Sequence, residues 1–229
     1  MVSSMELPSL LELLYSASDR SRTVRATVRR RNRQAREVEL LRARGFMREL
    51  PPIPPEEGSW GQPPEVIETT THVWAARPYG LRWESTFTGD GVSWRTSVGV
   101  KEGELFWQRF GENDEVHTNE GREGHGTMTT DEERLLDPSS LLGVYRFEIT
   151  GETTRLGRPA VEVRARRRLG AHAHEFGPLS DELALVVDIE RGVLLRVAVV
   201  VEGEELSFSE IEEIVFDEHI SSELFGPLR

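Results

Sequence analysis

Residues 81–110 read LRWESTFTGDGVSWRTSVGVKEGELFWQRF. In 81–88 and again in 92–100, apolar residues alternate with polar ones, as they do in strands that bury one face. The turn Thr88-Gly89-Asp90-Gly91 between these two runs is a strong hairpin signal. A second turn, Lys101-Glu102-Gly103, returns the chain as a third strand. The stretch therefore predicts consecutive antiparallel strands.

The same alternation recurs on both sides of this stretch, whereas helical spacing is confined to short segments. Leu10, Leu11 and Leu14 lie at helical spacing within residues 8–17, and a second helix is expected over 33–45. A capped helix start is expected at 137–142. Further strands are expected over 23–31, 66–75, 145–150, 160–168, 183–189, 193–201 and 206–216.

The order of these segments indicates the fold class. Strands follow one another without long helices between them, which argues against a parallel doubly wound sheet. We expect an α+β fold: one strongly curved antiparallel sheet (a half-open β-barrel) with two or three helices covering its concave face. The 229 residues suit a single domain over 1–229. A Pro-rich loop over 51–64 and a polar, Gly-rich loop over 111–135 interrupt the pattern.

Composition narrows the classes of partner. The chain has no cysteine, which excludes disulfides, thiolate metal sites and cysteine catalysis. Its formal net charge of −12 argues against a nucleic-acid partner, because nucleic-acid binding needs a basic face. No apolar window approaches the roughly 18 residues of a membrane span, so we expect no stable membrane insertion. The first residues, MVSSMELP, lack the basic and apolar regions of a secretory signal, and we expect a cytoplasmic protein.

Aromatic residues concentrate in the stretch that decides the fold. All five tryptophans fall within residues 60–107. Cross-strand neighbours lie about 5 Å apart, so adjacent strands would stack several of these rings on one face. The rings form either ordinary core or the wall of a pocket for an apolar ligand. The wall residues that we expect are Trp83, Phe87, Trp94, Val98 and Trp107.

Histidines supply the few candidates for catalysis or metal binding. His172-Ala173-His174 places two imidazoles on one face of a strand, but no third ligand is evident, so no metal site is predicted. His125 and His72 are candidate bases, and no nucleophile motif accompanies either of them. No residue pattern predicts a catalytic group or a cofactor. We therefore expect a protein that is not an enzyme.

Two runs of arginine stand on predicted strands. They are Arg29-Arg30-Arg31 and Arg166-Arg167-Arg168, the latter preceded by Arg164. In an acidic protein such runs are typical of solvated faces or of cross-sheet partners for glutamates. An anionic headgroup or an acidic protein partner is the alternative.

The order of several motifs gives the sequence a resemblance to a known superfamily. Residues 135–142 read LLDPSSLL, the turn Gly157-Arg158-Pro159-Ala160 follows, and 185–196 read LVVDIERGVLLR. In this order the chain resembles the lipoprotein-carrier superfamily of LolA/LolB carriers, LppX-type lipoproteins and RseB-like sensors, and is similar to uncharacterised actinobacterial proteins. The resemblance covers residues 135–225 and implies a half-open antiparallel barrel over helices. Its cavity holds acyl chains in the carriers, and one pigment-biosynthesis enzyme shares the fold.

Three hypotheses of function follow. The first is non-enzymatic binding of a hydrophobic small molecule or lipid on the concave aromatic face. The helices over 8–17 and 33–45 and the loop over 111–135 would then act as plug or lid. The second is a regulatory module of RseB-like type that binds a protein partner. The third is an enzyme that acts on a hydrophobic biosynthetic intermediate.

Overall fold

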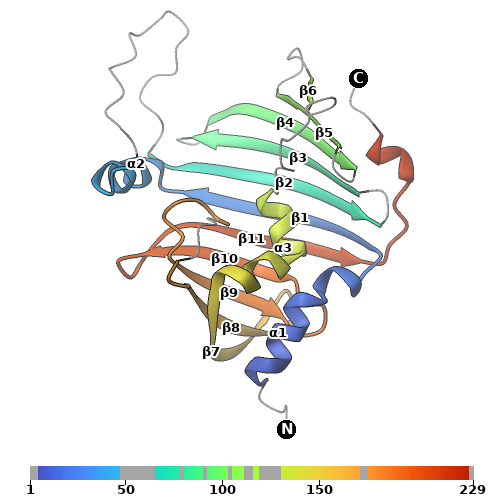
Figure 1. Cartoon of the computed structure of the whole chain (residues 1–229). Coiled ribbons are helices and arrows are strands. Elements are labelled where there is room, and N and C mark those ends of the chain that lie inside the picture. Colours follow the sequence, from blue (N-terminus) through green and yellow to red (C-terminus); the bar gives the residue numbers. More distant parts are fainter. Residues whose placement is uncertain are drawn as a thin grey trace, which may run out of the picture.

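The computed structural model describes residues 5–46, 65–77, 80–89, 92–102, 105–110, 116–118, 130–170 and 175–226. For 92–96, 105–106, 110 and 117–118 it describes the backbone alone. The described residues form one open antiparallel sheet of eleven strands (Figure 1). Its strands are β1 (Thr23–Asn32), β2 (Ile67–Ala76), β3 (Gly80–Gly89), β4 (Val92–Glu102), β5 (Leu105–Phe110), β6 (His117–Thr118), β7 (Tyr145–Arg155), β8 (Arg158–Arg167), β9 (Glu182–Asp188), β10 (Leu194–Val201) and β11 (Glu204–Phe216).

The first and last strands join two meanders. The strand order is β6-β5-β4-β3-β2-β1-β11-β10-β9-β8-β7, so β1 pairs with β2 on one side and with β11 on the other. The strand pairings are antiparallel, as the alternating pattern and the tight turns predict. The expected fold class, a curved open antiparallel sheet with few helices, is confirmed.

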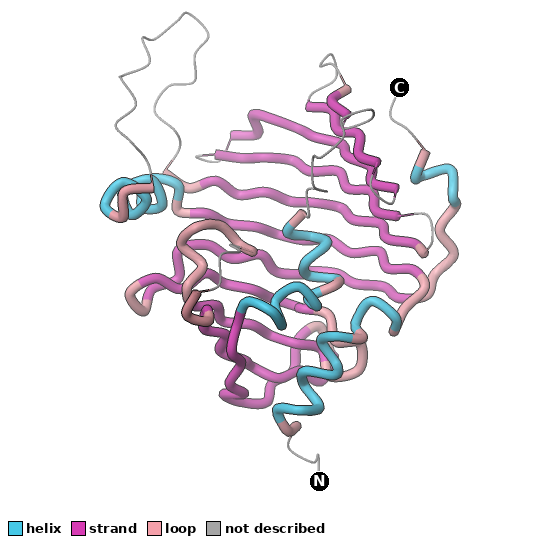
Figure 2. The backbone as a smooth tube through the Cα atoms, viewed as in Figure 1, coloured by secondary structure: helices cyan, strands magenta, loops and turns pink. Residues whose placement is uncertain are grey.

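Three of the helices lie on one face of the sheet, which we call the helix-covered face; the opposite face is the outer face. Helices α1 (Leu7–Tyr15), α3 (Asp131–Leu136) and α4 (Leu141–Val144) cross this face in Figure 1, and Figure 2 shows the same arrangement as a tube. A 3-10 turn, η2 (Pro138–Ser140), links α3 to α4. These elements cover much of the sheet from β1 toward β7.

Helix α1 fills the part of the helix-covered face next to the C-terminal strands. Its Leu10, Leu13 and Leu14 are buried in the main core, together with leucines and valines of β8, β9 and β10. The apolar spacing in the sequence dictates this placement, because the three leucines share one side of the helix. The turn before β10 approaches α1 closely: a Cβ on Gly192 would lie 2.4 Å from the carbonyl oxygen of Leu13.

Two sequence-based expectations need correction. The helix expected over 33–45 forms as α2 (Gln34–Ala43), but it lies beside the strand ends rather than across the sheet face (Figure 1). Part of the polar loop expected over 111–135 is helical, since Asp131–Leu136 forms α3 with the Thr130 side chain accepting a hydrogen bond from the Glu133 amide. The Pro-rich loop over 51–64 lies outside the described residues.

The outer face carries arginines that pair with carboxylates. Arg25 lies 2.6 Å from Glu218 and 3.1 Å from Glu213, and Arg29 lies 3.0 Å from Glu68. Of the two arginine runs, Arg29 and Arg31 pair across the sheet with Glu68, and Arg164 and Arg166 with Glu182, as predicted. Arg30 instead pairs with Asp131 of α3. Each such exposed pair contributes about 0–1 kcal/mol, so these pairs add little to the free energy of unfolding.

The chain after β11 also packs on the outer face. Ile220 and Phe225 are buried against Ala76, and Trp74 packs against this second, small cluster. The 3-10 turn η3 (Ser222–Phe225) contacts β3 and β4, and Arg82 donates a hydrogen bond of 3.3 Å to the Leu224 carbonyl oxygen. We call residues 217–226 the C-terminal strap.

Candidate functional site

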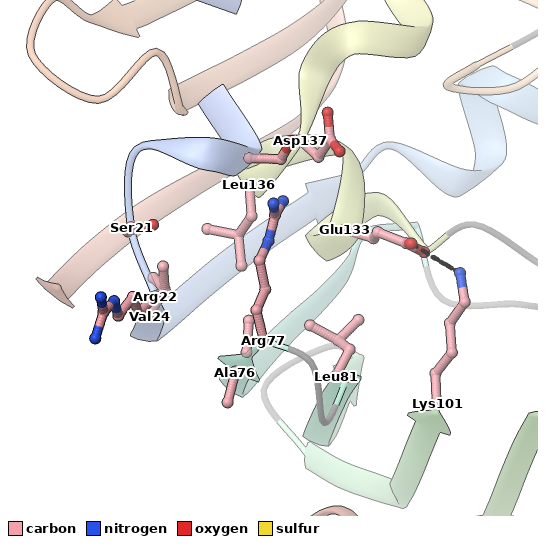
Figure 3. A pocket seen from close by; sticks show the side chains of 13 residues that line it. Ser21, Arg22, Val24, Ala76, Arg77, Leu81, Lys101, Glu133, Leu136 and Asp137 are labelled. Atoms are coloured by element: carbon pink, nitrogen blue, oxygen red, sulfur yellow. Dashed lines mark hydrogen bonds and ion pairs between the residues drawn. The ribbon is translucent and has the colours of Figure 1, made fainter. Parts of the chain in front are cut away.

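A cavity of about 270 Å3 opens at one end of the helix-covered face. It lies where the start of β1, the end of β2, the start of β3 and the end of β4 meet α3 (Figure 3). Small-molecule pockets usually hold about 300–1,000 Å3, so this cavity suits a small ligand or one part of a larger one. The residues that line it are Ser18, Ser21, Arg22, Val24, Ala75, Ala76, Arg77, Gly80, Leu81, Lys101, Glu133, Leu136 and Asp137.

The lining divides into an apolar floor and a charged rim. Val24 and Leu81 belong to the buried core, and Leu136 packs against that core from α3. Arg77, Lys101 and Glu133 lie around these groups in Figure 3. An apolar surface beside fixed charges is the arrangement that accepts an amphipathic molecule.

The rim contains a close ion pair between two distant parts of the chain. Lys101 Nζ, at the end of β4, lies 2.7 and 2.8 Å from the two carboxylate oxygens of Glu133 on α3. The Lys101 side chain is only 12% exposed and the Glu133 side chain 30%. Lys101 is the single lysine of the sequence. The pair therefore ties α3 to the far end of the sheet at the mouth of the cavity.

Two further basic groups stand at the rim. The Arg77 guanidinium lies 2.8 Å from the Asp19 carboxylate, and both side chains are half or more exposed. Arg22 also lines the cavity, but Figure 3 shows its guanidinium pointing away from the other labelled side chains. The Asp137 carboxylate accepts a hydrogen bond of 3.2 Å from the Ser139 amide and so caps the 3-10 turn η2.

Helix α3 is held by charges along its whole length. Asp131 lies 2.7 Å from Arg30 of β1, and Arg134 lies 2.9 Å from Glu175. Between them, desolvation raises the pKa of the Glu132 carboxyl, and the neighbouring Asp131 carboxylate raises it further. An ionised carboxyl that is desolvated in this way costs stability at neutral pH. The helix that covers the cavity is thus held by ion pairs and by Leu135, which is fully buried in the main core.

Glycine is required at the cavity wall. Gly80 has φ +118°, a conformation that L side chains rarely adopt. A Cβ at this position would lie 2.0 Å from the backbone oxygen of Lys101. The missing side chain therefore lets β3 approach β4 where Lys101 enters the rim.

The structure separates the residues of the expected aromatic wall. Opposite residues of an antiparallel pair share a face, and Trp83 pairs with Gly99, whereas Val98 pairs with Glu84. On the next strand Trp107 pairs with Val100. Trp83 and Phe87 therefore lie on the helix-covered face, and Val98 and Trp107 on the outer face. The side chain of Trp94 lies outside the described residues.

Of these residues, Trp83 lies nearest to the cavity floor. It is two positions beyond Leu81 on the same face of β3 and is 4% exposed within the main core. Phe87 lies four residues further along the strand and is half-buried. Trp107 is buried as well, but on the outer face, where the C-terminal strap contacts β4.

Of the histidine candidates, His72 lies within the described part of the chain, and it does not reach the cavity. It stands on the outer face, where its Nδ1 is 3.3 Å from Thr27 Oγ1. His125, His172 and His174 lie outside the described residues. Among the described side chains, no group of three or more His, Asp or Glu is arranged to hold a metal ion. No described helix is long and apolar enough to cross a bilayer.

A second and larger cavity, of about 630 Å3, lies between the start of α1 and the β7–β8 hairpin. Ala160 and Val161 contribute apolar surface, and Glu6 and Glu152 contribute carboxylates. Its described lining contains no basic side chain. The two cavities thus differ in charge, and the smaller one carries a lysine ion pair.

The rim residues are not evident from the sequence. The pattern places Lys101 in a turn, and Glu133 and Asp137 fall near or within a segment that reads as a polar loop or a helix cap. One signal is present, because Lys101 is the only lysine among 28 basic residues. Nothing in the sequence connects it with Glu133, which lies 32 positions away.

Comparisons with known proteins bear on the fold. No protein-family model matches the sequence, and no curated protein matches it. An uncharacterized conserved protein from Thermus thermophilus superposes with a TM-score of 0.50 at 13% identity, over 94% of this chain and 92% of its own. At this identity the likeness shows the fold alone.

Two other solved structures carry names from the expected superfamily. Mycobacterium tuberculosis lipoprotein LppX gives a TM-score of 0.49 at 11% identity, over 95% of this chain and 100% of its own. Pseudomonas aeruginosa MucB, solved with MucA, gives 0.46 at 16% identity, over 95% of this chain. This chain spans 59% of that MucA/MucB structure's chain. At these identities the likeness concerns the fold alone.

Proposed function

We propose that this protein binds an amphipathic, lipid-like ligand on its helix-covered face and that it is not an enzyme. The observation that carries the proposal is the cavity of about 270 Å3, whose apolar floor continues into the main core and whose rim is charged. Such a site accepts an apolar chain and orients a polar group at its mouth.

The packing of the helices supports this location. Leucines of α1 fill the helix-covered face beside β8, β9 and β10, and the larger cavity near the start of α1 has carboxylates and no basic side chain in its described lining. At the other end, α3 is attached through ion pairs to Arg30 and Lys101, both on the sheet. Helix α3 fully buries one leucine, Leu135, whereas α1 buries three, so separating these ion pairs and exposing one leucine costs less free energy than displacing α1. A ligand would therefore enter beneath α3, with Leu81 and Trp83 as its apolar contacts.

The charged outer face favours this function over the two alternatives. An acidic protein partner would need unpaired arginines, and Arg25 and Arg29 already pair with glutamates of the chain. An enzyme on a hydrophobic intermediate would need an acid or base free to react in the cavity, but Glu133 pairs with Lys101 and Asp137 caps η2. The candidate base His72 lies on the opposite face. If the protein binds a protein partner instead, the experiment below should detect neither a lipid nor dye binding.

Mass spectrometry of the purified protein tests the proposal first. Native spectra followed by organic extraction should show a lipid-like molecule at stoichiometric amount. An apo protein should bind the neutral dye Nile red, and Leu136→Trp should abolish this binding by filling the cavity. Leu142→Trp is the matched control, because Leu142 is a half-buried leucine of α4 outside the cavity lining. A clean apo mass together with no Nile red binding would overturn the proposal and favour a protein-interaction module.

A second comparison locates the ligand on one face. Trp83→Phe should weaken Nile red binding, whereas Trp107→Phe should leave it unchanged, because Trp107 lies on the outer face. Equal effects of the two substitutions would contradict binding beneath α3. Ligand contact by Trp94 and Phe87 stays a prediction.

A further inference from the structure

We infer that the ligand carries an anionic headgroup, a carboxylate or a phosphate, that Lys101 binds in place of Glu133. This inference rests on the proposed function and specifies its ligand class. The cavity joins the apolar floor at Leu81 to the Lys101 ammonium group at its rim. In the structure Glu133 supplies the anion that a ligand headgroup would supply.

The geometry of the ion pair makes the exchange feasible. Lys101 donates to both carboxylate oxygens of Glu133, and a ligand carboxylate or phosphate offers the same pair of acceptors. The Lys101 side chain is nearly buried at 12% exposed, whereas the Glu133 side chain is 30% exposed. Glu133 therefore regains hydration when it leaves, while the lysine keeps an anionic partner. Replacing one charge-assisted hydrogen bond by another costs little free energy.

The other charges of the rim favour an anion over a cation. Arg77 lies at the mouth, and its partner Asp19 is 77% exposed, so this guanidinium is open to a second contact from a headgroup. The rim carboxylates, by contrast, are engaged: Glu133 with Lys101, and Asp137 with the Ser139 amide. A cationic headgroup would meet Lys101 and Arg77, and to reach Glu133 it would have to displace the nearly buried Lys101 ammonium group.

The overall charge does not explain these basic groups. The chain has a formal net charge of −12, so a lysine placed nearly buried beside an apolar floor is a local feature. The larger cavity near α1 has carboxylates and no basic side chain in its described lining. An anionic amphiphile is therefore expected in the smaller cavity and not in the larger one.

Calorimetric titration with four ten-carbon probes tests the inference: decanoate, decyl phosphate, 1-decanol and decylamine. A hydrogen bond to a charged group contributes about 1.5–3 kcal/mol, so the preferred anion should bind about tenfold more tightly than 1-decanol, or more. The ratio of decanoate to decyl phosphate affinity identifies the headgroup. Decylamine should bind no more tightly than 1-decanol.

Substitutions at the rim test whether Lys101 recognises the headgroup. Lys101→Met should reduce anion affinity to the level of 1-decanol, Lys101→Arg should keep the preference, and Glu133→Gln should strengthen anion binding by removing the competing carboxylate. Arg196→Met is the matched control, since Arg196 is a similarly buried, ion-paired cation on another part of the sheet. Each variant is first checked for a cooperative thermal transition.

The outcomes distinguish this inference from the proposed function. Tight binding of 1-decanol, equal to that of decanoate and decyl phosphate, would overturn the headgroup assignment and leave the proposed function standing. The same holds if Lys101→Met folds and keeps its preference for the anions. Failure of all four probes to bind would overturn both proposals.

Discussion

Trp83 of β3 lies directly over Gly99 of β4, with its ring where a side chain would otherwise stand. The two residues are register partners, and a Cβ on Gly99 would fall 2.0 Å from Cζ2 of the indole. The indole is 4% exposed, so it has no free space into which to move. This contact fixes the indole, which lies two residues beyond the cavity-lining Leu81, and explains why β4 carries glycine in an otherwise alternating strand.

Gly99→Ala should therefore destabilise the protein. The added methyl forces the buried indole or the strand to shift, which typically costs about 1–3 kcal/mol. Urea denaturation monitored by tryptophan fluorescence measures the change. Gly143→Ala is the control, because nothing lies within 4 Å of a Cβ at that helical position, and it should be neutral or slightly stabilising. An unaltered stability of Gly99→Ala would contradict the placement of Trp83.

A second pair of glycines tests whether α1 packs against the turn before β10. Gly192 and Gly157 both have positive φ, +76° and +72°, but only Gly192 approaches α1, where a Cβ would meet the Leu13 carbonyl oxygen at 2.4 Å. Gly157→Ala should cost about 1–2 kcal/mol for the left-handed backbone alone. Gly192→Ala should cost about 1–3 kcal/mol more, because it also displaces the helix. Equal losses in denaturant unfolding would show that α1 does not rest on this turn.

The strands were predictable because their signal is local. Alternation of apolar and polar residues along 81–100 places each strand, and the Gly89-Asp90-Gly91 turn joins two of them. The register between two paired strands, by contrast, does not follow from the alternation within either strand. The pairing shifts between Phe87 and Thr88, so Trp83 faces Gly99 and not a residue of the predicted tryptophan row. One irregularity near the turn thus sends Val98 to the opposite face from Trp83.

The cavity itself was not predictable from the sequence. Its floor combines Val24, Leu81 and Leu136, which are brought together only when β1 pairs with β2 and α3 folds back across the sheet. Its rim depends on one contact between Lys101 and Glu133. Such contacts follow from tertiary packing, whereas periodicity reports only which side of an element is buried. The sequence pattern accordingly predicts the buried face of β3 but not the site on it.

The perturbed carboxyl of α3 predicts a pH-dependent stability. The pKa of Glu132 is raised in the folded protein by desolvation and by Asp131, so folding is penalised when this group is ionised. That penalty is present above the raised folded pKa and is lost as pH falls toward the unfolded value of about 4.3. Glu132→Gln should therefore raise the free energy of unfolding at pH 7, and the gain should vanish near pH 4. Urea denaturation at several pH values checks this, with Glu148→Gln on the exposed side of β7 as control. A gain that is equal at both pH values would contradict the assignment to Glu132.

The C-terminal strap tests whether the two faces of the sheet act independently. Phe225 is 3% exposed and packs with Ile220 on Ala76 at the outer face, and Ala76 also lines the cavity. Phe225→Ala should lower the free energy of unfolding by about 3 kcal/mol, at the low end for a buried phenylalanine because the cluster is small. Tyr15→Ala, at a side chain 71% exposed, should change it by less than about 0.5 kcal/mol. Nile red binding, measured without denaturant at a temperature where both variants are folded, should match that of the unaltered protein. Weaker binding by Phe225→Ala would mean that the strap controls the cavity. The coupling would run through Ala76, or through β3 and β4, which contact the strap and contribute residues to the cavity wall.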